Sequence, residues 1–484
     1  MAPTTRRRFL KTSFTAALCA TAVGTHATSA WLFNHDAQNR ASLDSAIRKL
    51  TSQITGRVIS PGAPDYESSR LVFNRAFDQQ PALIARCASA SDVTRVLDFA
   101  QSHNLPLAVR GGGHSRAGFG VCDGGVVLDL SSMRGVDVNP EKRVARVQAG
   151  ALVQNLEQAT AQFGLATPSG GCPNVGIAGF TLGGGEGKLM TMHGAACDNV
   201  VSAQVVLVEG KQVQASADSH PDLFWAIRGG GGNFGVVTEF EYRLYPLGKV
   251  LNGALGYGPG QIPDVLHGFS KFCASAPDEI VALGELLPSE GGPRFINHLI
   301  HFGDAGKGND LMKPLRSLIK PESDTLKVMS YLDSQMEGFR PAPFAHFQTN
   351  VFLPELNDSA IKAIDTAIHD APQQFRVLIV PFTGAITRVK VTDTAFALRQ
   401  TGFEVDMLST WSDPAQKPAV VKWVHALRDS LQPFAKGVYV NQVSETSEEL
   451  VRAAYGTNLD RLRRIKKKYD PSNVLHINQN ISPA

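Results

Sequence analysis

The chain has 484 residues, which is more than one hydrophobic core usually holds, so its length predicts two domains. Hydrophobic residues make up 43% of it and charged residues 19%, as in an ordinary globular protein, and the 45 glycines are the one excess. The formal charge of +3 comes from residues 1–30, which hold four basic side chains and no acid. The rest of the chain is near neutral, which gives no electrostatic reason to expect nucleic acid or a membrane surface as a partner.

The first thirty residues predict an export signal. A basic segment, T-R-R-R-F-L-K at residues 5–11, precedes a mild apolar run, and small residues at 27–30 suit a signal peptidase. The apolar run is too short to cross a bilayer as a helix, so no membrane span is predicted. The basic segment resembles the bacterial twin-arginine signal, which the twin-arginine export machinery reads. We therefore expect a periplasmic or secreted protein from which residues 1–30 are removed.

Five of the six cysteines lie outside this signal. An odd number of cysteines in an exported protein suggests that at least one thiol has a role other than a disulfide. No C-x-x-C motif occurs, so the sequence gives no support for a zinc or thioredoxin-type site, and no metal site is predicted.

The region that begins near residue 60 opens with strands and a helix. Leu83–Ala85 is a short strand candidate, and Ser91 and Asp92 suit the start of a helix over Val93–His103. Two further strands are predicted at Leu107–Arg110 and Val126–Leu130.

Three consecutive glycines, Gly111–Gly113, follow the first of these two strands and lead into His114 and Ser115. Without Cβ atoms the backbone can take positive φ and bring its N–H groups close to a ligand. Successive amides of this kind form an anion-binding concavity, so we interpret the loop as a cradle for phosphate oxygens with His114 at its rim. A plain surface turn is the alternative, because glycine clusters usually mark turns.

A second glycine-dense region covers residues 168–187 and contains Cys172. It follows a predicted strand over Arg143–Gln148 and a predicted helix over Ala151–Phe163, with Gly164 suited to end that helix. So many glycines without repetition indicate backbone that lies against a ligand.

Two motifs further on are similar to nucleotide-binding loops, and neither fits. Gly230–Gly235 satisfies G-x-G-x-x-G, but a predicted helix, Asp222–Arg228, precedes it and a predicted strand, Val236–Tyr242, follows it. The dinucleotide fingerprint needs the opposite order. Gly187-Lys188 lacks the first glycine and the Ser/Thr of a P-loop.

From residue 246 to 435 glycine becomes rarer, which predicts a second domain. Its amphipathic helices alternate with strand candidates such as Ile280–Leu287, Arg294–His301 and Arg376–Pro381. The last part of the chain predicts a strand at Val438–Asn441, a helix at Leu459–Tyr469 and a half-buried strand within Asn473–Ile481.

Residues 110–115, 170–187, 222–238 and 478–481 together resemble the berberine-bridge-enzyme-like FAD-linked oxidases, which have the vanillyl-alcohol-oxidase or PCMH-type FAD-binding fold. Each motif alone is modest, but their order and spacing are specific. The resemblance implies an α+β fold with a two-subdomain FAD-binding domain over 60–245, completed by residues 436–484. It also implies a substrate domain over 246–435, an antiparallel sheet covered by helices.

The resemblance implies FAD held by two covalent bonds, from His114 to the flavin 8α carbon and from Cys172 to flavin C6. Neutral imidazole and thiolate are the reactive forms for such bonds, and a buried small hydrophobe is the alternative for Cys172. The residues that the matched motifs place at the cofactor are Arg110, Gly111, Gly112, Gly113, His114, Ser115, Gly118, Cys172, Val175, Gly176, Gly179, Gly183, Gly235, Val237, Asn478 and Gln479.

Two residues receive catalytic roles from the resemblance. Val175 stands where a valine beside the flavin goes with reactivity toward oxygen. Tyr439 stands where the family commonly has its base, although a tyrosine pKa near 10 would have to be lowered by positive charge or by the flavin. A packed strand aromatic is the alternative for Tyr439. Gln442 and Thr191 depart from the family pattern, which has an aromatic residue and an arginine there.

These roles imply an oxidase. A base takes a proton from a substrate alcohol or amine while hydride passes to the flavin, and molecular oxygen then accepts the electrons and yields hydrogen peroxide. The alternatives are an FAD-dependent dehydrogenase with another acceptor and a flavin-containing binding protein without turnover. Sugars, aromatic alcohols and secondary metabolites all remain possible small-molecule substrates, because one fold hosts many chemistries.

Overall fold

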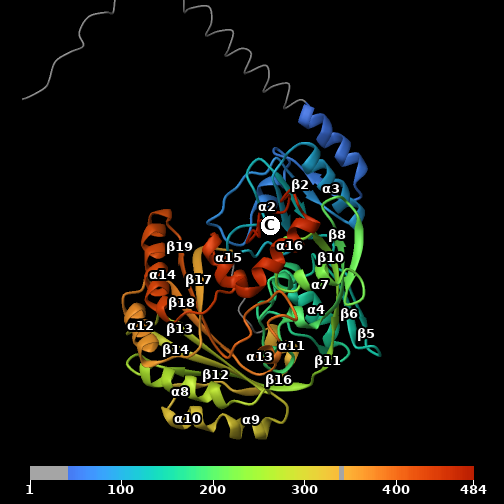
Figure 1. Ribbon diagram of the computed structural model, residues 1–484. Coiled ribbons are helices and arrows are strands. Elements are labelled where there is room, and N and C mark those ends of the chain that lie inside the picture. The colour runs from blue at the N-terminus through green and yellow to red at the C-terminus, as the bar shows by residue number, and fades with distance from the viewer. Residues whose placement is uncertain (1–41, 337–342) are drawn as a thin grey trace, which may run out of the picture. The chain divides into compact units, whose positions relative to one another are not determined.

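The computed structural model describes residues 42–336 and 343–484 (Figure 1). The export signal predicted at residues 1–30 lies outside the described residues. The chain divides into two compact units, residues 1–52 and residues 53–484. The first is described over 42–52, which is helical, and all features below belong to the second.

A four-stranded sheet begins the second unit, in the order β1-β2-β4-β3. Its strands are β1 Arg57–Ile59, β2 Leu83–Arg86, β3 Leu107–Arg110 and β4 Val126–Asp129. Strand β4 runs parallel to β2 and β3, whereas β1 is antiparallel to β2. Helix α3, Ala90–Ser102, buries one apolar face, as predicted, but it begins earlier than predicted because Ser89 caps it. The Asp92 carboxylate instead accepts backbone N–H bonds from Thr55 and Gly56, 2.9 Å each.

A five-stranded antiparallel sheet follows, in the order β5-β6-β10-β8-β9. Its strands are β5 Val136–Asn139, β6 Val144–Gln148, β8 Val200–Val206, β9 Gln212–Ser216 and β10 Val236–Arg243. Helix α4, Val153–Ala161, comes directly after β6, and Gly164 has φ +63° beyond its end, as expected for a residue that terminates a helix. A short ribbon pairs β7 Leu165–Ala166 with β11 Tyr245–Pro246.

The largest sheet has eight strands, all antiparallel, in the order β15-β12-β14-β13-β18-β19-β17, with β16 also paired to β12. Its strands are β12 Lys249–Tyr257, β13 Ile280–Leu287, β14 Arg294–Phe302, β15 Ser323–Asp324, β16 Lys327–Ser330, β17 Ala345–Leu353, β18 Phe375–Phe382 and β19 Gly402–Trp411. The antiparallel sheet expected in the second half of the chain is therefore confirmed.

One face of this sheet is apolar and carries helices. Successive side chains of a strand point to opposite faces, so Phe403, Val405 and Met407 of β19 share one face. They are buried in a single core together with residues of α8 Ile262–Ser275, α12 Asp358–His369 and α14 Lys417–Leu431, which Figure 1 shows on one side of the sheet. Glu404 and Asp406 lie on the opposite face, which these helices do not cover.

The remaining helices are short. They are α2 Tyr66–Arg70, α5 Ile177–Leu182, α6 Met190–His193, α7 Pro221–Ala226, α9 Ala305–Leu311, α10 Lys313–Leu318, α11 Tyr331–Met336, α13 Ala385–Arg388, α15 Glu448–Tyr455 and α16 Leu459–Tyr469. Within the described ranges, no helix is both long and apolar enough to cross a membrane.

The two strands predicted near the carboxyl terminus are not formed. Val440–Gln442 is a 3-10 turn, and Asn473–Ile481 has no regular structure. Distant asparagine side chains take the place of a neighbouring strand. Asn350 accepts from the N–H of Tyr439 and donates to its carbonyl (2.8 Å each), while Asn233 accepts from the N–H of Ile481 (3.0 Å).

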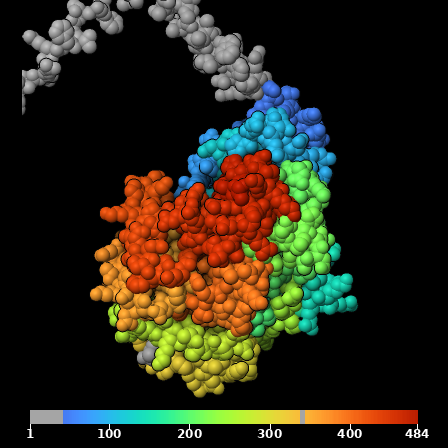
Figure 2. Space-filling view, in the orientation of Figure 1, coloured from blue at the N-terminus to red at the C-terminus, as the bar shows by residue number. Residues whose placement is uncertain are grey.

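The carboxyl-terminal segment is also held by a buried lysine. Lys466 has no exposed surface, and its ammonium donates to Asp470 (2.7 Å) and to the carbonyls of Asn233 and Leu475 (2.9 Å each). Figure 2 shows these last residues, in red, next to the green residues of the first half of the chain. The segment is thus fixed to the loop that precedes β10.

Candidate active site

The two predicted attachment loops touch each other. A Cβ atom on Gly112 would lie 2.4 Å from the backbone nitrogen of Gly176, and one on Gly176 would lie 2.3 Å from that of Gly112. Only glycine permits backbones to approach so closely. The loop that carries His114 and the loop that carries Cys172 are therefore neighbours, although some sixty residues separate them in sequence.

His114 is held by stacking. Its ring lies 4.0 Å from the Phe73 ring, centroid to centroid, at an angle of 19°, and the N–H of Phe73 donates to the carbonyl of Gly113 (2.9 Å). Burial and the positive charge of Arg116 lower the pKa of His114 to about 3, so its imidazole is neutral at physiological pH. Its Nδ1 is buried and has no hydrogen-bond partner among the described residues. A neutral ring nitrogen is thus presented to whatever occupies the site.

The other predicted members of this loop shape it. Arg110 is 7% exposed, and one of its terminal nitrogens donates to Asp129 (2.9 Å), while the other is buried without a partner in the described part of the chain. The carbonyl of Ser115 accepts from Gly118 and its hydroxyl from Phe119, at 3.2 Å each. These bonds close a turn directly after His114.

Helix α4 fixes the loop that carries Cys172. The N–H groups of Val153 and Gln154, in the first turn of α4, donate to the carbonyls of Val175 and Pro173 at 2.9 Å each. A helix leaves such N–H groups without partners inside the helix, so they are available to hold another segment. The Cys172 thiol donates to Asn174 Oδ1 (2.8 Å) inside the same turn.

Cys172 is also the cysteine best placed to react. Its side chain is partly exposed, whereas Cys87, Cys122, Cys197 and Cys273 are buried. Burial raises the pKa of each of these four thiols and keeps them protonated and unreactive.

The other predicted site residues lie outside the contact between the two loops. Cβ atoms on Gly118, Gly183 and Gly235 would collide with Phe77, Asn441 and Val205, whereas Gly179 faces open space. Val237 is buried in β10. The amide groups of Asn478 and Gln479 donate to the carbonyls of Leu475 and Glu445 (3.0 Å each), and their amide oxygens are buried without a partner among the described residues.

Tyr439, the predicted base, is 2% exposed. Its hydroxyl oxygen accepts hydrogen bonds from the N–H of Gly185 (3.1 Å) and from the Asn441 side chain (2.9 Å). Burial and the nearby carboxyl of Glu186 raise the pKa of Tyr439 well above its ordinary value. A role as base requires the reverse, a pKa lowered by positive charge or by the flavin.

Three carboxyl groups that the sequence did not single out form a cluster, of which Glu186 and Glu404 lie near Tyr439 and Asp406 near those two. Glu404 and Asp406 project from the uncovered face of β19, and Glu186 belongs to the glycine-dense segment. The carboxyls of Glu186 and Glu404 are within hydrogen-bonding reach of each other, and burial raises the pKa of both. The charged pair E-x-D in an otherwise apolar strand is the one sequence signal that could have revealed Glu404 and Asp406.

Asp406 has the most defined surroundings of the three. The Gln348 amide donates to its two oxygens at 2.7 and 2.8 Å. Burial raises the pKa of Asp406 to about 6, although Gln348, Arg376 and Arg116 oppose the rise. An ionisable group that titrates close to neutral pH suits proton transfer.

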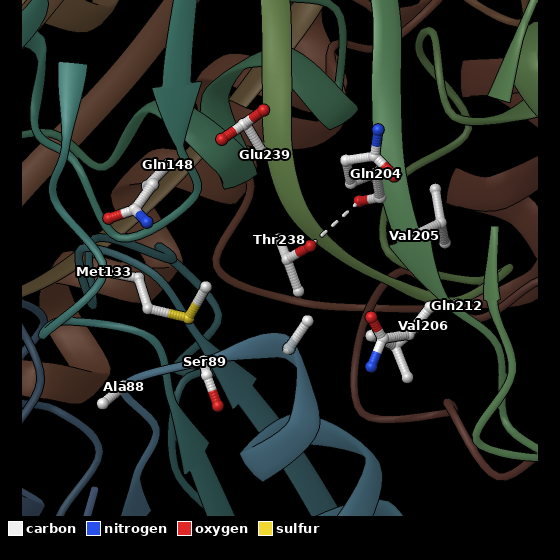
Figure 3. Close-up of a pocket in the computed structure, with 11 residues that line it drawn as sticks. Ala88, Ser89, Met133, Gln148, Gln204, Val205, Val206, Gln212, Thr238 and Glu239 are labelled. Carbon is white, nitrogen blue, oxygen red and sulfur yellow. Dashed lines mark hydrogen bonds between the residues drawn. The ribbon is translucent and has the colours of Figure 1, made fainter. Parts of the chain in front are cut away.

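A separate cavity of about 320 Å³ lies between the first two sheets (Figure 3). Residues 88–90 and Met133 line one side of it, and side chains from β6, β8, β9 and β10 line the other, with Thr238 donating to the carbonyl of Gln204 (3.3 Å). Thr238 follows Val237, but none of the predicted site residues lines this cavity. The charge of Arg116 interacts with His114, Cys172 and Asp406 alike, so the candidate active site is the region around Arg116 where these three residues meet.

The residues present fit an FAD. The neutral Nδ1 of His114 and the second terminal nitrogen of Arg110 are buried without partners in the described structure. Gly113 has φ +69°, and the glycine loop presents backbone instead of side chains to its surroundings. Such a loop accommodates phosphate oxygens, and a polar atom left without a partner points to a ligand that supplies one.

Comparison with known proteins agrees with this geometry. Residues 81–216 match the family described as FAD binding domain, and residues 438–482 match the one described as berberine and berberine like. The uncharacterized FAD-linked oxidoreductase YgaK of Bacillus subtilis is 32% identical over 447 residues, which cover 89% of this chain and 98% of that protein. Xylooligosaccharide oxidase of Thermothelomyces thermophilus is 28% identical over 492 residues, covering 92% and 95%.

A solved structure shows the same fold. The crystal structure of 6-hydroxy-D-nicotine oxidase from Arthrobacter nicotinovorans gives a TM-score of 0.82 at 28% identity, and the match covers 89% of this chain and 98% of that one. Fold, glycine loops and matches together define an FAD-dependent oxidoreductase. The chain belongs to the berberine-bridge-enzyme-like family of FAD-linked oxidoreductases, which confirms the predicted family, α+β fold and FAD cofactor.

Proposed function

We propose that this enzyme is an exported oxidase that carries FAD bonded to both His114 and Cys172. It takes hydride from an alcohol or amine group of a small molecule and passes the electrons to oxygen, with hydrogen peroxide as the product. The observation that carries the proposal is the neutral, unpartnered Nδ1 of His114 on a glycine loop in contact with the loop of Cys172. Bound FAD supplies the hydride acceptor, and the protein supplies binding, orientation and proton transfer.

Asp406 is the proton acceptor that the geometry favours. Its pKa of about 6 makes it ionised at neutral pH, and the Gln348 amide fixes both of its oxygens. Tyr439 stays the alternative base from the sequence. Its hydroxyl oxygen already accepts N–H bonds from Gly185, Glu186 and Asn441, and its raised pKa keeps the hydroxyl protonated at neutral pH, so it is not available to accept a proton.

Val175 supports oxygen as the electron acceptor. Its carbonyl is bonded to α4 and its side chain is partly exposed, so the residue is fixed but accessible. In the resemblance, a valine here leaves room for oxygen at the flavin. We expect Val175→Leu to slow reoxidation by oxygen without slowing reduction by substrate.

The relatives suggest two substrate classes, because one is named for a xylooligosaccharide and another for 6-hydroxynicotine. Periplasmic or secreted localisation rests on the basic segment at residues 5–11. A reporter protein fused behind residues 1–30 tests it: export should stop when Arg6 and Arg7 are replaced by lysine.

An anaerobic screen tests the activity. Sugars, aromatic alcohols and cyclic amines are added one at a time, and a substrate bleaches the absorbance of oxidised flavin near about 450 nm. Admitting oxygen should then yield one hydrogen peroxide per substrate consumed. Bleaching without peroxide would identify a dehydrogenase instead, and the absence of bleaching by every compound would support a flavin-containing binding protein.

A further inference from the structure

A buried polar network lies behind the loop of Cys172. Glu157 of α4 is 2% exposed, Ser169 is fully buried and Gln335 of α11 is 1% exposed. The Ser169 hydroxyl donates to the Glu157 carboxylate. The Gln335 amide donates to the Ser169 hydroxyl (3.2 Å) and to the carbonyl of Gly170 (3.4 Å).

Burying these polar groups lowers the stability of the fold, which indicates that the network has a function. A carboxyl group taken out of water loses its hydration, so burial raises the pKa of Glu157 to about 7, against the opposing effects of Ser169, Gln335 and Lys188. None of the steps proposed for catalysis uses Glu157. An apolar side chain of similar volume would fill the same space without the desolvation cost.

The position of the network shows what it holds. Cys172 follows Ser169 by three residues, and the two residues between them are glycines, which have no side chain that could anchor the backbone. On the other side of Cys172, the carbonyls of Pro173 and Val175 are bonded to the first turn of α4. Glu157 lies on the same helix, so α4 holds the chain on both sides of the cysteine.

The loop of His114 does not share these anchors. It is positioned by the stacking of His114 on Phe73 and by the hydrogen bond between Phe73 and Gly113. Its contact with the cysteine loop is at Gly112 and Gly176, beyond the residues that Glu157, Ser169 and Gln335 hold. Loss of the network should therefore affect one attachment point and spare the other.

We propose that Glu157 is the positioning residue for the bond between Cys172 and the flavin, which it serves by fixing Ser169 at the base of the cysteine loop. The proposal rests on the double attachment proposed above. Forming that bond replaces the S–H bond of Cys172 and one C–H bond of the flavin by a C–S bond. The two protons and two electrons that are released reduce one molecule of oxygen to hydrogen peroxide.

The test measures each bond separately, in two backgrounds. With His114→Ala, flavin that stays with acid-denatured protein is attached through Cys172 alone, and with Cys172→Ala it is attached through His114 alone. We expect Glu157→Leu to lower the retained flavin about fivefold or more in the first background, as for the loss of one buried hydrogen bond, and to leave it unchanged in the second. Glu157→Gln keeps an acceptor for Ser169 and should restore the Cys172 bond.

Ser169→Ala is a smaller change and replaces Glu157→Leu in the test if that variant does not fold. It should likewise lower the flavin retained through Cys172 and not the flavin retained through His114. An equal loss in both backgrounds would show general damage to the fold, and no loss in either would show that the network does not position Cys172. Both results overturn the proposal while leaving double attachment in place. If His114→Ala alone retains no flavin at all, double attachment itself fails, and the role of Glu157 fails with it.

Discussion

The two loops that present His114 and Cys172 are held in position by different interactions. The loop of His114 follows strand β3 directly and is held by the stack of His114 on Phe73 and by the hydrogen bond between Phe73 and Gly113. The loop of Cys172 depends on the N-terminal turn of α4 and on buried polar groups. Because the loops meet at a pair of glycines, the two attachment points should respond separately to most mutations and together to a change at that contact.

Gly112→Ala should have the largest effect, because it forces the two loops apart. The new Cβ would lie 2.4 Å from the backbone of Gly176, which cannot move aside as a flexible side chain could. We expect loss of most bound flavin and a fall in the free energy of unfolding of about 1–3 kcal/mol. Flavin absorbance per protein and thermal unfolding measure these effects. Gly171→Ala is the matched control, since its Cβ would meet no atom within 4 Å; equal damage by both variants would contradict the close contact.

Asp406→Asn should remove the proton acceptor and leave both covalent bonds to the flavin intact. Loss of the proton acceptor is expected to slow anaerobic flavin reduction by about 10²–10⁴-fold. In the unaltered enzyme the rate should fall as the pH drops through about 6, because the folded-state pKa of Asp406 is raised to that value and the protonated carboxyl cannot accept a proton. Stopped-flow reduction between pH 5 and pH 8 checks both statements, with the exposed Asp358→Asn as the control. A rate that does not change in Asp406→Asn would return the role to Tyr439.

His114→Ala should separate the two loops functionally. The flavin stays attached through Cys172, but one bond to the ring is lost, so its reduction potential and the turnover rate should fall. A drop of about 30 mV corresponds to a factor of ten in the equilibrium constant of a two-electron couple, and we expect a roughly tenfold slower turnover. Redox titration measures the potential, a steady-state assay measures the turnover, and peptide mass shows which attachment remains. Unchanged turnover together with an unchanged flavin adduct would show that His114 is not an attachment point.

Tyr439→Phe should have the smallest effect. If Asp406 is the base, removal of a hydroxyl that accepts hydrogen bonds from Gly185 and Asn441 should alter the reduction rate by less than about threefold and should cost about 1 kcal/mol of stability. A loss of about a hundredfold or more would assign the proton transfer to Tyr439.

Local features of the sequence were enough to predict the loops. Gly111–Gly113 and the segment around Cys172 need backbone conformations and close approaches that favour glycine, so their glycine content predicts both loops. The carboxyl cluster was not predictable in the same way, because Glu186 meets Glu404 only after β19 has paired in the correct register with its neighbours. The strands predicted at Val438–Asn441 and Asn473–Ile481 fail for a related reason, since side chains from distant segments satisfy their backbones.

The central claim, that one FAD is bonded to both His114 and Cys172, is tested most directly by digesting the acid-precipitated enzyme and measuring the masses of its peptides. Attachment through both loops predicts a yellow precipitate and one cross-linked product in which the peptides of His114 and Cys172 share a single FAD. Flavin that passes entirely into the supernatant, with both peptides at their unmodified masses, would contradict it.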